Sequence, residues 1–196
     1  MDAIGGYTSD VAAARASLVQ ELRAHALVIG AVTLTSGARA EYYVDAKRAI
    51  LRPAGFAALA ALLAAQAAEW EATAVGGMTM GADAVACAAL AGGADVKAFF
   101  VRKEAKAHGL QRRIEGPPLA DHERCLVVED VVTTGGSTLA AIAALQEAGQ
   151  TICGVVSVLD RLAGGAAAIE RAAGAPYAPL STIDEVYPDR PDRGSG

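Results

Sequence analysis

Residues Arg124–Ala140 read RCLVVEDVVTTGGSTLA, and this stretch decides the fold. The apolar run Leu126–Val128 is typical of a buried parallel strand. Two carboxylates, Glu129-Asp130, follow it, and Val131-Val132 continue the run. The loop Thr133–Thr138 is small and rich in glycine and hydroxyl groups, and a helical pattern begins directly after it. A strand, a glycine-rich loop and a helix in this order predict an anion site.

The loop Thr133–Thr138 has the features of a phosphate site. The first N–H groups of the following helix lack partners, and the positive end of the helix dipole lies there. Gly135 and Gly136 let the backbone approach an anion closely. No lysine follows the glycines, so this is not a Walker loop, and the dinucleotide pattern GxGxxG does not match.

The acid pair Glu129-Asp130 needs a partner other than phosphate, which it repels. A ribose satisfies both features, because its two vicinal hydroxyls donate to carboxylates while its 5′-phosphate lies in the loop. The alternative is a solvated strand end followed by an ordinary strand-to-helix connection. The segment Leu126–Thr138 resembles the phosphoribosyl pyrophosphate (PRPP) signature of type I phosphoribosyltransferases, a resemblance that does not by itself name the base.

Composition limits the alternatives. A chain of 196 residues with 53% hydrophobic residues predicts a single domain over 1–196. The net charge of −5 argues against a nucleic-acid partner held by a basic field. Three widely spaced cysteines without metal-ligand spacing fit a reducing cytosol. We see neither a signal-peptide pattern nor a membrane-spanning run, so we expect a cytoplasmic protein.

The N-terminal part predicts a strand pair. Val28–Leu34 is followed by Glu41–Asp45, with a turn near Ser36–Ala38. Tyr42 and Tyr43 alone read as ordinary strand aromatics. With Ser36-Gly37 before them and Asp45 after them, however, the segment resembles the part of orotate phosphoribosyltransferases that forms a hood over the base.

Two further loops follow predicted strands. Gly76–Asp83 comes after a strand at Thr73–Val75 and before a helix through Leu90, and is a second possible anion site or a plain turn. Asp95–Val101 is another strand, and RKEAKAHG follows it at Arg102–Gly109. This cationic run is either a solvated loop or a mobile loop that stabilises a leaving group.

The string RKEAKAHG resembles the catalytic loop of orotate phosphoribosyltransferases. In that family the loop closes partly over the site of the neighbouring subunit. The resemblance therefore implies a homodimer in which the loop 102–118 reaches the neighbouring site. The dipeptide Asp160-Arg161, at the end of a strand predicted over Ile152–Leu159, alone reads as a surface feature. In the family an arginine at this point contacts the carboxylate of orotate.

The remaining pattern predicts the rest of the fold. We expect a parallel α/β sheet with helices on both faces, a core over about residues 70–175, and a small hood from 1–50 plus the chain end. Further expected elements are helices from Ser9-Asp10 to His25, from Arg52-Pro53 to Trp70 and over Gly164–Ala173, a last strand over Tyr177–Thr182, and disorder over 189–196.

The resemblance implies transfer of phosphoribose from PRPP to orotate, giving orotidine 5′-monophosphate and pyrophosphate in de novo pyrimidine (UMP) biosynthesis. It implies Mg²⁺ held mainly by the substrate, without a dedicated protein metal site. The implied catalytic residues are Lys103, Lys106, His108 and Asp130. The implied PRPP-binding residues are Arg102, Lys103, Lys106, His108, Glu129, Asp130, Val131, Val132, Thr133, Thr134, Gly135, Gly136 and Ser137. The implied orotate-binding residues are Thr133, Arg161, Tyr42 and Tyr43.

Two positions depart from the family pattern. Many members carry a lysine in the hood before Ser-Gly, where this chain has Thr35, and another in the second glycine loop, where it has Thr79 and Met80. Both changes remove positive charge near phosphate. A PRPP-binding regulator without catalysis is therefore one alternative, and a purine phosphoribosyltransferase is another.

Overall fold

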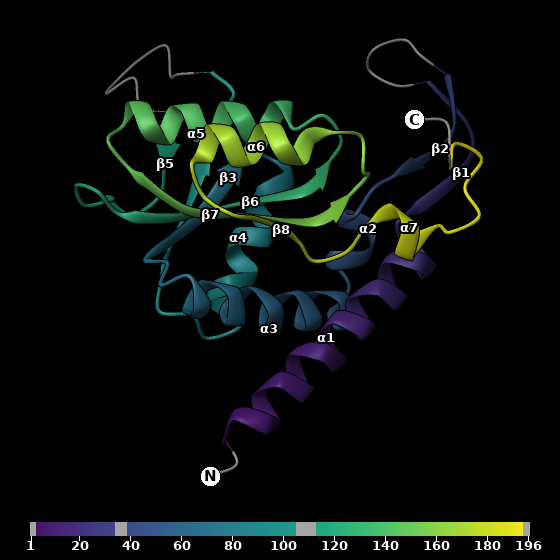
Figure 1. The fold of residues 1–196 in the computed structure, drawn as a ribbon, viewed down its shortest axis with the longest axis horizontal. Coiled ribbons are helices and arrows are strands. Elements are labelled where there is room, and N and C mark those ends of the chain that lie inside the picture. The colour runs from purple at the N-terminus through teal and green to yellow at the C-terminus, as the bar shows by residue number, and fades with distance from the viewer. Residues whose placement is uncertain (1–2, 34–38, 105–112, 194–196) are drawn as a thin grey trace.

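The structure is a computed structural model that describes residues 3–33, 39–104 and 113–193. Figure 1 shows a central sheet between two helical layers, with a smaller two-stranded sheet to one side. The central sheet has the strand order β5-β4-β3-β6-β7-β8, and all its pairs are parallel except β4 with β5. The predicted α/β class is confirmed. The strands are β3 (Ala74–Met78), β4 (Lys97–Val101), β5 (Ile114–Glu115), β6 (Arg124–Val132), β7 (Thr151–Asp160) and β8 (Tyr177–Pro179).

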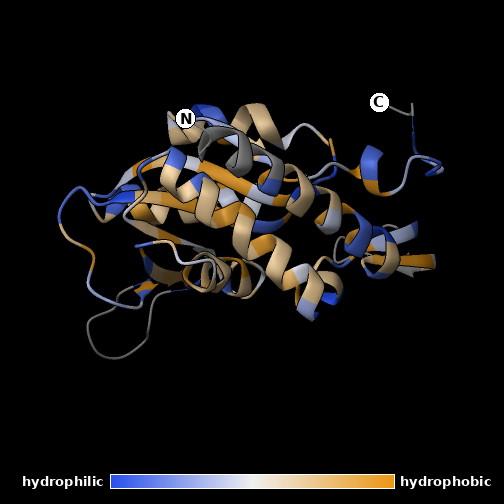
Figure 2. Ribbon diagram, turned by 90° about the horizontal axis from the view of Figure 1, so that it is seen from below, coloured by the Kyte–Doolittle hydropathy of each residue, from blue (hydrophilic) through white to orange (hydrophobic). Residues whose placement is uncertain are grey.

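Helices cover both faces of the sheet, as the alternating pattern predicts. α3 (Pro53–Glu69) and α4 (Gly81–Ala91) lie on one face, and α5 (Gly136–Glu147) and α6 (Gly165–Ala173) on the other (Figure 1). Each face has its own buried apolar cluster, and α3 and α5 each contribute fully buried leucine or isoleucine side chains. Figure 2 shows hydrophobic residues along the central strands and hydrophilic residues toward the loops. The core thus fixes the strand ends that form the site.

The hood consists of α1 (Ala3–His25), β1 (Leu27–Thr33), β2 (Arg39–Val44), α2 (Lys47–Ile50) and α7 (Ile183–Val186). β1 and β2 pair antiparallel, which confirms the predicted strand pair, and the expected turn at 36–38 lies outside the described residues. Among the helices of the described residues, none combines the length and the apolar composition needed to cross a membrane.

Several predicted boundaries are wrong. α1 begins at Ala3 rather than at Ser9-Asp10. Serine and aspartate inside a helix each cost less than about 1 kcal/mol relative to alanine, so a possible cap residue does not prevent the helix from extending through it. β3 runs through its two glycines to Met78, since pairing with β4 and β6 outweighs the low strand preference of glycine. α5 begins at Gly136, so the end of the predicted loop is its first turn.

The chain end also differs from the prediction. The last strand stops at Pro179, and Thr182 instead caps α7. We expect disorder over 189–196, yet residues 189–193 form turns against the hood, where Arg190 and Asp192 make ion pairs. A composition rich in charge and proline predicts disorder only where the segment has no folded surface of the protein to pack against.

Candidate active site

The site is a cavity of about 410 Å³ at the carboxyl edge of the sheet, where β3, β6 and β7 meet the hood. The carboxyl ends of parallel strands are the usual ligand position in open α/β sheets. Its described lining contains three cations and two acids. The lining residues are Tyr43, Val44, Lys47, Met78, Thr79, Met80, Gly81, Lys103, Glu129, Asp130, Val131, Thr133, Ser137 and Arg161.

The acid pair is buried, with Glu129 5% and Asp130 8% exposed, which rules out the solvated strand end. The two carboxylates lie close together but have different partners. Glu129 Oε2 accepts a hydrogen bond from Thr138 Oγ1 at 3.5 Å, and Asp130 Oδ2 lies 2.8 Å from Lys47 Nζ. A Cβ on Gly81 would come within 2.5 Å of Asp130 Oδ1 and 2.8 Å of Glu129 Oε1. Glycine at this position therefore leaves room for both carboxylates.

Burial raises the pKa of Glu129 to about 8, and the neighbouring charge of Asp130 adds to the effect. Only weak hydrogen bonds oppose this shift. A pKa of about 8 keeps a proton on Glu129 near neutral pH, whereas Asp130 has the Lys47 ammonium beside it. The two acids therefore have different environments, since Glu129 is buried beside another carboxyl group and Asp130 lies beside an ammonium group.

The hydroxyl loop forms a second, adjoining cavity of about 210 Å³. Gly135 has a φ of 85°, the left-handed region that favours glycine, and α5 begins at the next residue. The start of this 12-residue helix therefore faces the loop hydroxyls. The residues predicted to bind phosphate thus line one hollow, the phosphate hollow. It is lined by Glu129, Val131, Thr133, Thr134, Gly135, Gly136, Ser137 and Thr138. Val132 is buried behind it.

Arg161 lies in the cavity wall and joins the core to the hood. Its guanidinium donates to the Tyr42 hydroxyl at 3.0 Å and lies 5.0 Å from the centre of the Tyr42 ring. The Tyr42 hydroxyl in turn donates to Asp192 of the chain end at 3.0 Å. Tyr42 is buried behind the wall, and Tyr43, which is 40% exposed, lines the cavity. Of the predicted tyrosines, only Tyr43 therefore faces the cavity directly.

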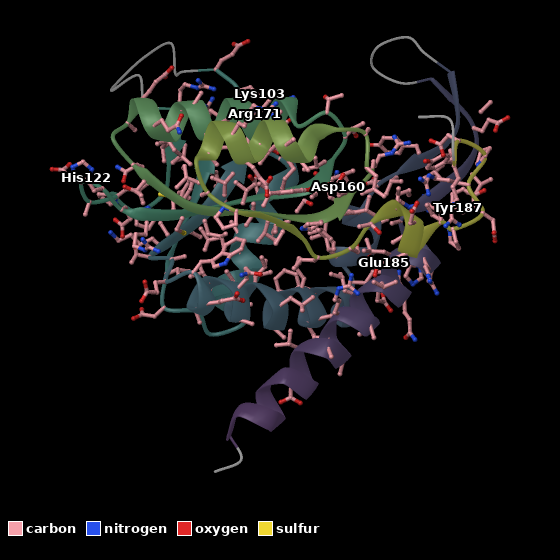
Figure 3. All side chains as sticks on the ribbon, in the orientation of Figure 1. Lys103, His122, Asp160, Arg171, Glu185 and Tyr187 are labelled. Atoms are coloured by element: carbon pink, nitrogen blue, oxygen red, sulfur yellow. The ribbon has the colours of Figure 1, made fainter. Side chains whose placement is uncertain are left out.

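The residue before Arg161 is held from behind. Asp160 Oδ1 accepts the N–H of Leu162 at 2.7 Å, and Asp160 Oδ2 accepts the Tyr177 hydroxyl at 3.1 Å. Ser157 is 2.6 Å from the same hydroxyl. Figure 3 shows Asp160 at the end of β7, on the side toward the hood. These contacts fix the backbone from which Arg161 projects.

The basic loop is anchored at the same edge. β5 returns antiparallel to β4, and the N–H of Arg102 donates to the carbonyl of Arg113 at 2.8 Å. Lys103 lines the cavity, whereas Arg102 lies 3.6 Å from Glu115 and does not line it. The predicted residues Lys106 and His108 lie outside the described residues. The start of the loop thus lies beside the site, and its far end pairs with β4.

Two residues at or near the site, Lys47 and Asp192, are not among those that the sequence predicts. Lys47 follows the strand that carries the two tyrosines by only a few residues, so its proximity to the site could have been inferred from that strand's end. Asp192 Oδ2 lies 3.9 Å from the guanidinium of Arg161. No pattern in the neighbouring sequence indicates that the chain end packs against Arg161, so this contact could not have been predicted.

These features define a phosphoribosyltransferase: a phosphate hollow, a buried acid pair and a cationic loop on one parallel sheet. A family model described as a phosphoribosyl transferase domain matches residues 49–171. Orotate phosphoribosyltransferase of Corynebacterium glutamicum is 49% identical over 176 residues, 89% of this chain and 95% of that protein. The chain therefore belongs to the orotate phosphoribosyltransferase family.

Solved structures agree with this assignment. A crystal structure of Mycobacterium tuberculosis orotate phosphoribosyltransferase in complex with Fe(III) dicitrate is 43% identical, with a TM-score of 0.80, and the match covers 89% of this chain and 99% of that chain. The enzyme from the same organism in complex with PRPP gives a TM-score of 0.75 at 38% identity, over 88% and 98% of the two chains. The fold of the chain thus has solved relatives in one family.

Proposed function

We propose that this protein transfers 5-phosphoribose from PRPP to orotate, giving orotidine 5′-monophosphate and pyrophosphate. The observation that carries the proposal is one cavity that joins a phosphate hollow, a buried acid pair and Arg161. The bond between ribose C1 and the pyrophosphate oxygen breaks, a bond from the orotate ring nitrogen to C1 forms, and the proton on that nitrogen is released. Family membership supports the identity of both substrates.

Each part of the site has a task in this reaction. The loop Thr133–Ser137 binds the 5′-phosphate, and Glu129 and Asp130 accept the ribose hydroxyls. Negative charge beside the sugar favours the cationic carbon that develops as pyrophosphate leaves. Lys103 and the adjoining basic loop neutralise the leaving group, and closure of that loop excludes water that would hydrolyse the activated sugar. Arg161 selects the carboxylated base.

Mg²⁺ fits this arrangement as a substrate-borne ion. Among the described residues, no group of three or more His, Cys, Asp or Glu side chains could hold a metal. Mg²⁺ usually retains waters and binds substrate phosphates with one or two carboxylates. Glu129 and Asp130 would be the carboxylates available to such an ion, and a bound ion would neutralise charge on the pyrophosphate.

Two further parts of the proposal concern the whole protein. We expect a homodimer in which the loop 102–118 reaches the neighbouring site. Analytical ultracentrifugation tests the oligomeric state, and mixing two inactive variants tests whether the sites are shared. Two inactive variants, one in the loop and one in the acid pair, regain activity on mixing if the sites are shared. We also expect a cytoplasmic location, and cell fractionation tests it.

The test of the function is an absorbance assay with PRPP, Mg²⁺ and orotate, and with uracil, adenine and hypoxanthine in parallel. Orotate alone should be consumed. Lys103→Ala and Lys106→Ala should lower kcat strongly, whereas Arg171→Ala, an exposed cation on α6, should not. Arg161→Ala should raise KM for orotate by about tenfold or more with little change for PRPP.

The assay also decides between the alternatives. Consumption of adenine or hypoxanthine in place of orotate would establish a purine enzyme. PRPP binding without consumption of any base would support the non-catalytic regulator and overturn the proposed reaction.

A further inference from the structure

The hood places a lysine at the site that the sequence motifs do not include. Lys47 begins α2 and lines the same cavity as the acid pair. Its Nζ lies 2.8 Å from Asp130 Oδ2 and 3.1 Å from Asp45 Oδ1, and its side chain remains 37% exposed. The ammonium is therefore held by two carboxylates and still open to a ligand.

The position of Lys47 relative to the two cavities indicates which end of PRPP it faces. The smaller cavity, which accommodates the 5′-phosphate, is lined by Glu129 but by neither Asp130 nor Lys47. Of these two cavities, Lys47 and Asp130 line the larger one, together with the loop Met78–Gly81. PRPP carries its pyrophosphate on the carbon opposite the 5′-phosphate. Lys47 thus lies on the pyrophosphate side of the acid pair.

The pyrophosphate end of the larger cavity needs a positive charge to bind an anionic group. Thr79 and Met80 line the cavity where many family members have a lysine, and both side chains are uncharged. Among the cavity residues of the described chain, Arg161 already contacts Tyr42 and the chain end. Lys103 and Lys47 are the other two cations. Among the described residues, Lys47 is the cation whose ion pair with Asp130 the structure shows.

We propose that Lys47 binds the pyrophosphate group of PRPP and takes over the task of the lysine that is absent from the second glycine loop. This inference rests on the proposed function. An ammonium group has three N–H donors, and two carboxylates are its partners in this structure. The third donor can reach a pyrophosphate oxygen while Asp130 keeps its contact and accepts a ribose hydroxyl. Lys47 would therefore join the sugar and the leaving group in one network.

Calorimetric titration of the full chain with three probes tests the proposal. The probes are PRPP, pyrophosphate with Mg²⁺, and ribose 5-phosphate, which lacks the pyrophosphate. Lys47→Met removes the charge and keeps most of the side-chain length. We expect it to weaken pyrophosphate and PRPP about tenfold or more, as is usual for loss of a charge-assisted hydrogen bond, and to leave ribose 5-phosphate within about twofold.

Two variants serve as controls. Arg48→Met removes an exposed cation from the next position of the same helix, so all three affinities should stay at the wild-type values. Lys47→Arg keeps the charge, and pyrophosphate affinity should stay within a few-fold of wild type. If Lys47→Met does not fold, as judged by circular dichroism, Lys47→Gln replaces it in the same comparison with Lys47→Arg.

The outcomes separate this proposal from the proposed reaction. Unchanged pyrophosphate affinity in Lys47→Met would overturn it. Equal losses for ribose 5-phosphate and pyrophosphate would also overturn it, because Lys47 would then act only by positioning Asp130. Wild-type protein that binds all three probes but consumes no orotate would contradict the reaction and leave the binding result for Lys47 intact.

Discussion

The buried acid Glu129 should make the protein less stable as the pH rises through neutrality. Burial raises its folded-state pKa to about 8, against an ordinary value of 4.5. Between these two values the folded state binds more protons than the unfolded state, so the free energy of unfolding falls as the pH increases. At about 1.4 kcal/mol per pKa unit, the loss between pH 6 and pH 8 comes to about 2 kcal/mol.

Glu129→Gln should remove this dependence. The amide keeps the shape of the side chain and cannot ionise. The free energy of unfolding of the variant, relative to that of the wild type, should therefore rise by about 2 kcal/mol between pH 6 and pH 8. Urea unfolding at fixed protein concentration, followed by circular dichroism across this range, gives the two curves. All other titratable groups are common to both proteins, so the difference between the curves isolates Glu129.

Glu123→Gln is the matched control. Hydrogen bonds from Lys97 and from the N–H of Ala120 lower the pKa of Glu123, so this carboxyl titrates below the tested range. Its amide variant should be less stable at every pH and should run parallel to the wild type. If the curve of Glu129→Gln is also parallel to the wild type, burial does not keep a proton on Glu129, and the reasoning fails.

Two further predictions concern the contacts around the site. Gly81→Ala should weaken PRPP binding about tenfold or more, because its Cβ would lie within 3 Å of both Glu129 and Asp130 and displace them; an unchanged Kd in calorimetry would show that the carboxylates can move freely. Asp192→Asn should lower KM for orotate about two- to fivefold, since it removes a half-exposed charge 3.9 Å from Arg161, a pair worth about 1 kcal/mol or less. A higher KM would show instead that Asp192 holds Arg161 in a productive position.

The local chemistry of the site could be predicted from the sequence. The segment Leu126–Thr138 combines a buried strand, two acids and a glycine-rich loop, and each feature is set by neighbours along the chain. The hydroxyl loop accordingly forms a hollow at the start of α5. The α/β class also follows, because strands and helices alternate with the expected periods. The burial of Glu129 and Asp130 needed the tertiary structure, since the same acids could end a solvated strand.

The partners of the site residues were decided only by the tertiary structure. Lys47 meets Asp130 across 83 positions, and Arg161 meets Tyr42 across 119. Local spacing does not encode such contacts, which depend on how the hood packs on the carboxyl edge of the sheet. The chain end shows the same limit, since its composition predicts disorder while Asp192 finds Tyr42 and Arg161 as partners. Sequence therefore determined which groups we propose to bind the sugar phosphate, and packing determined which charges surround them.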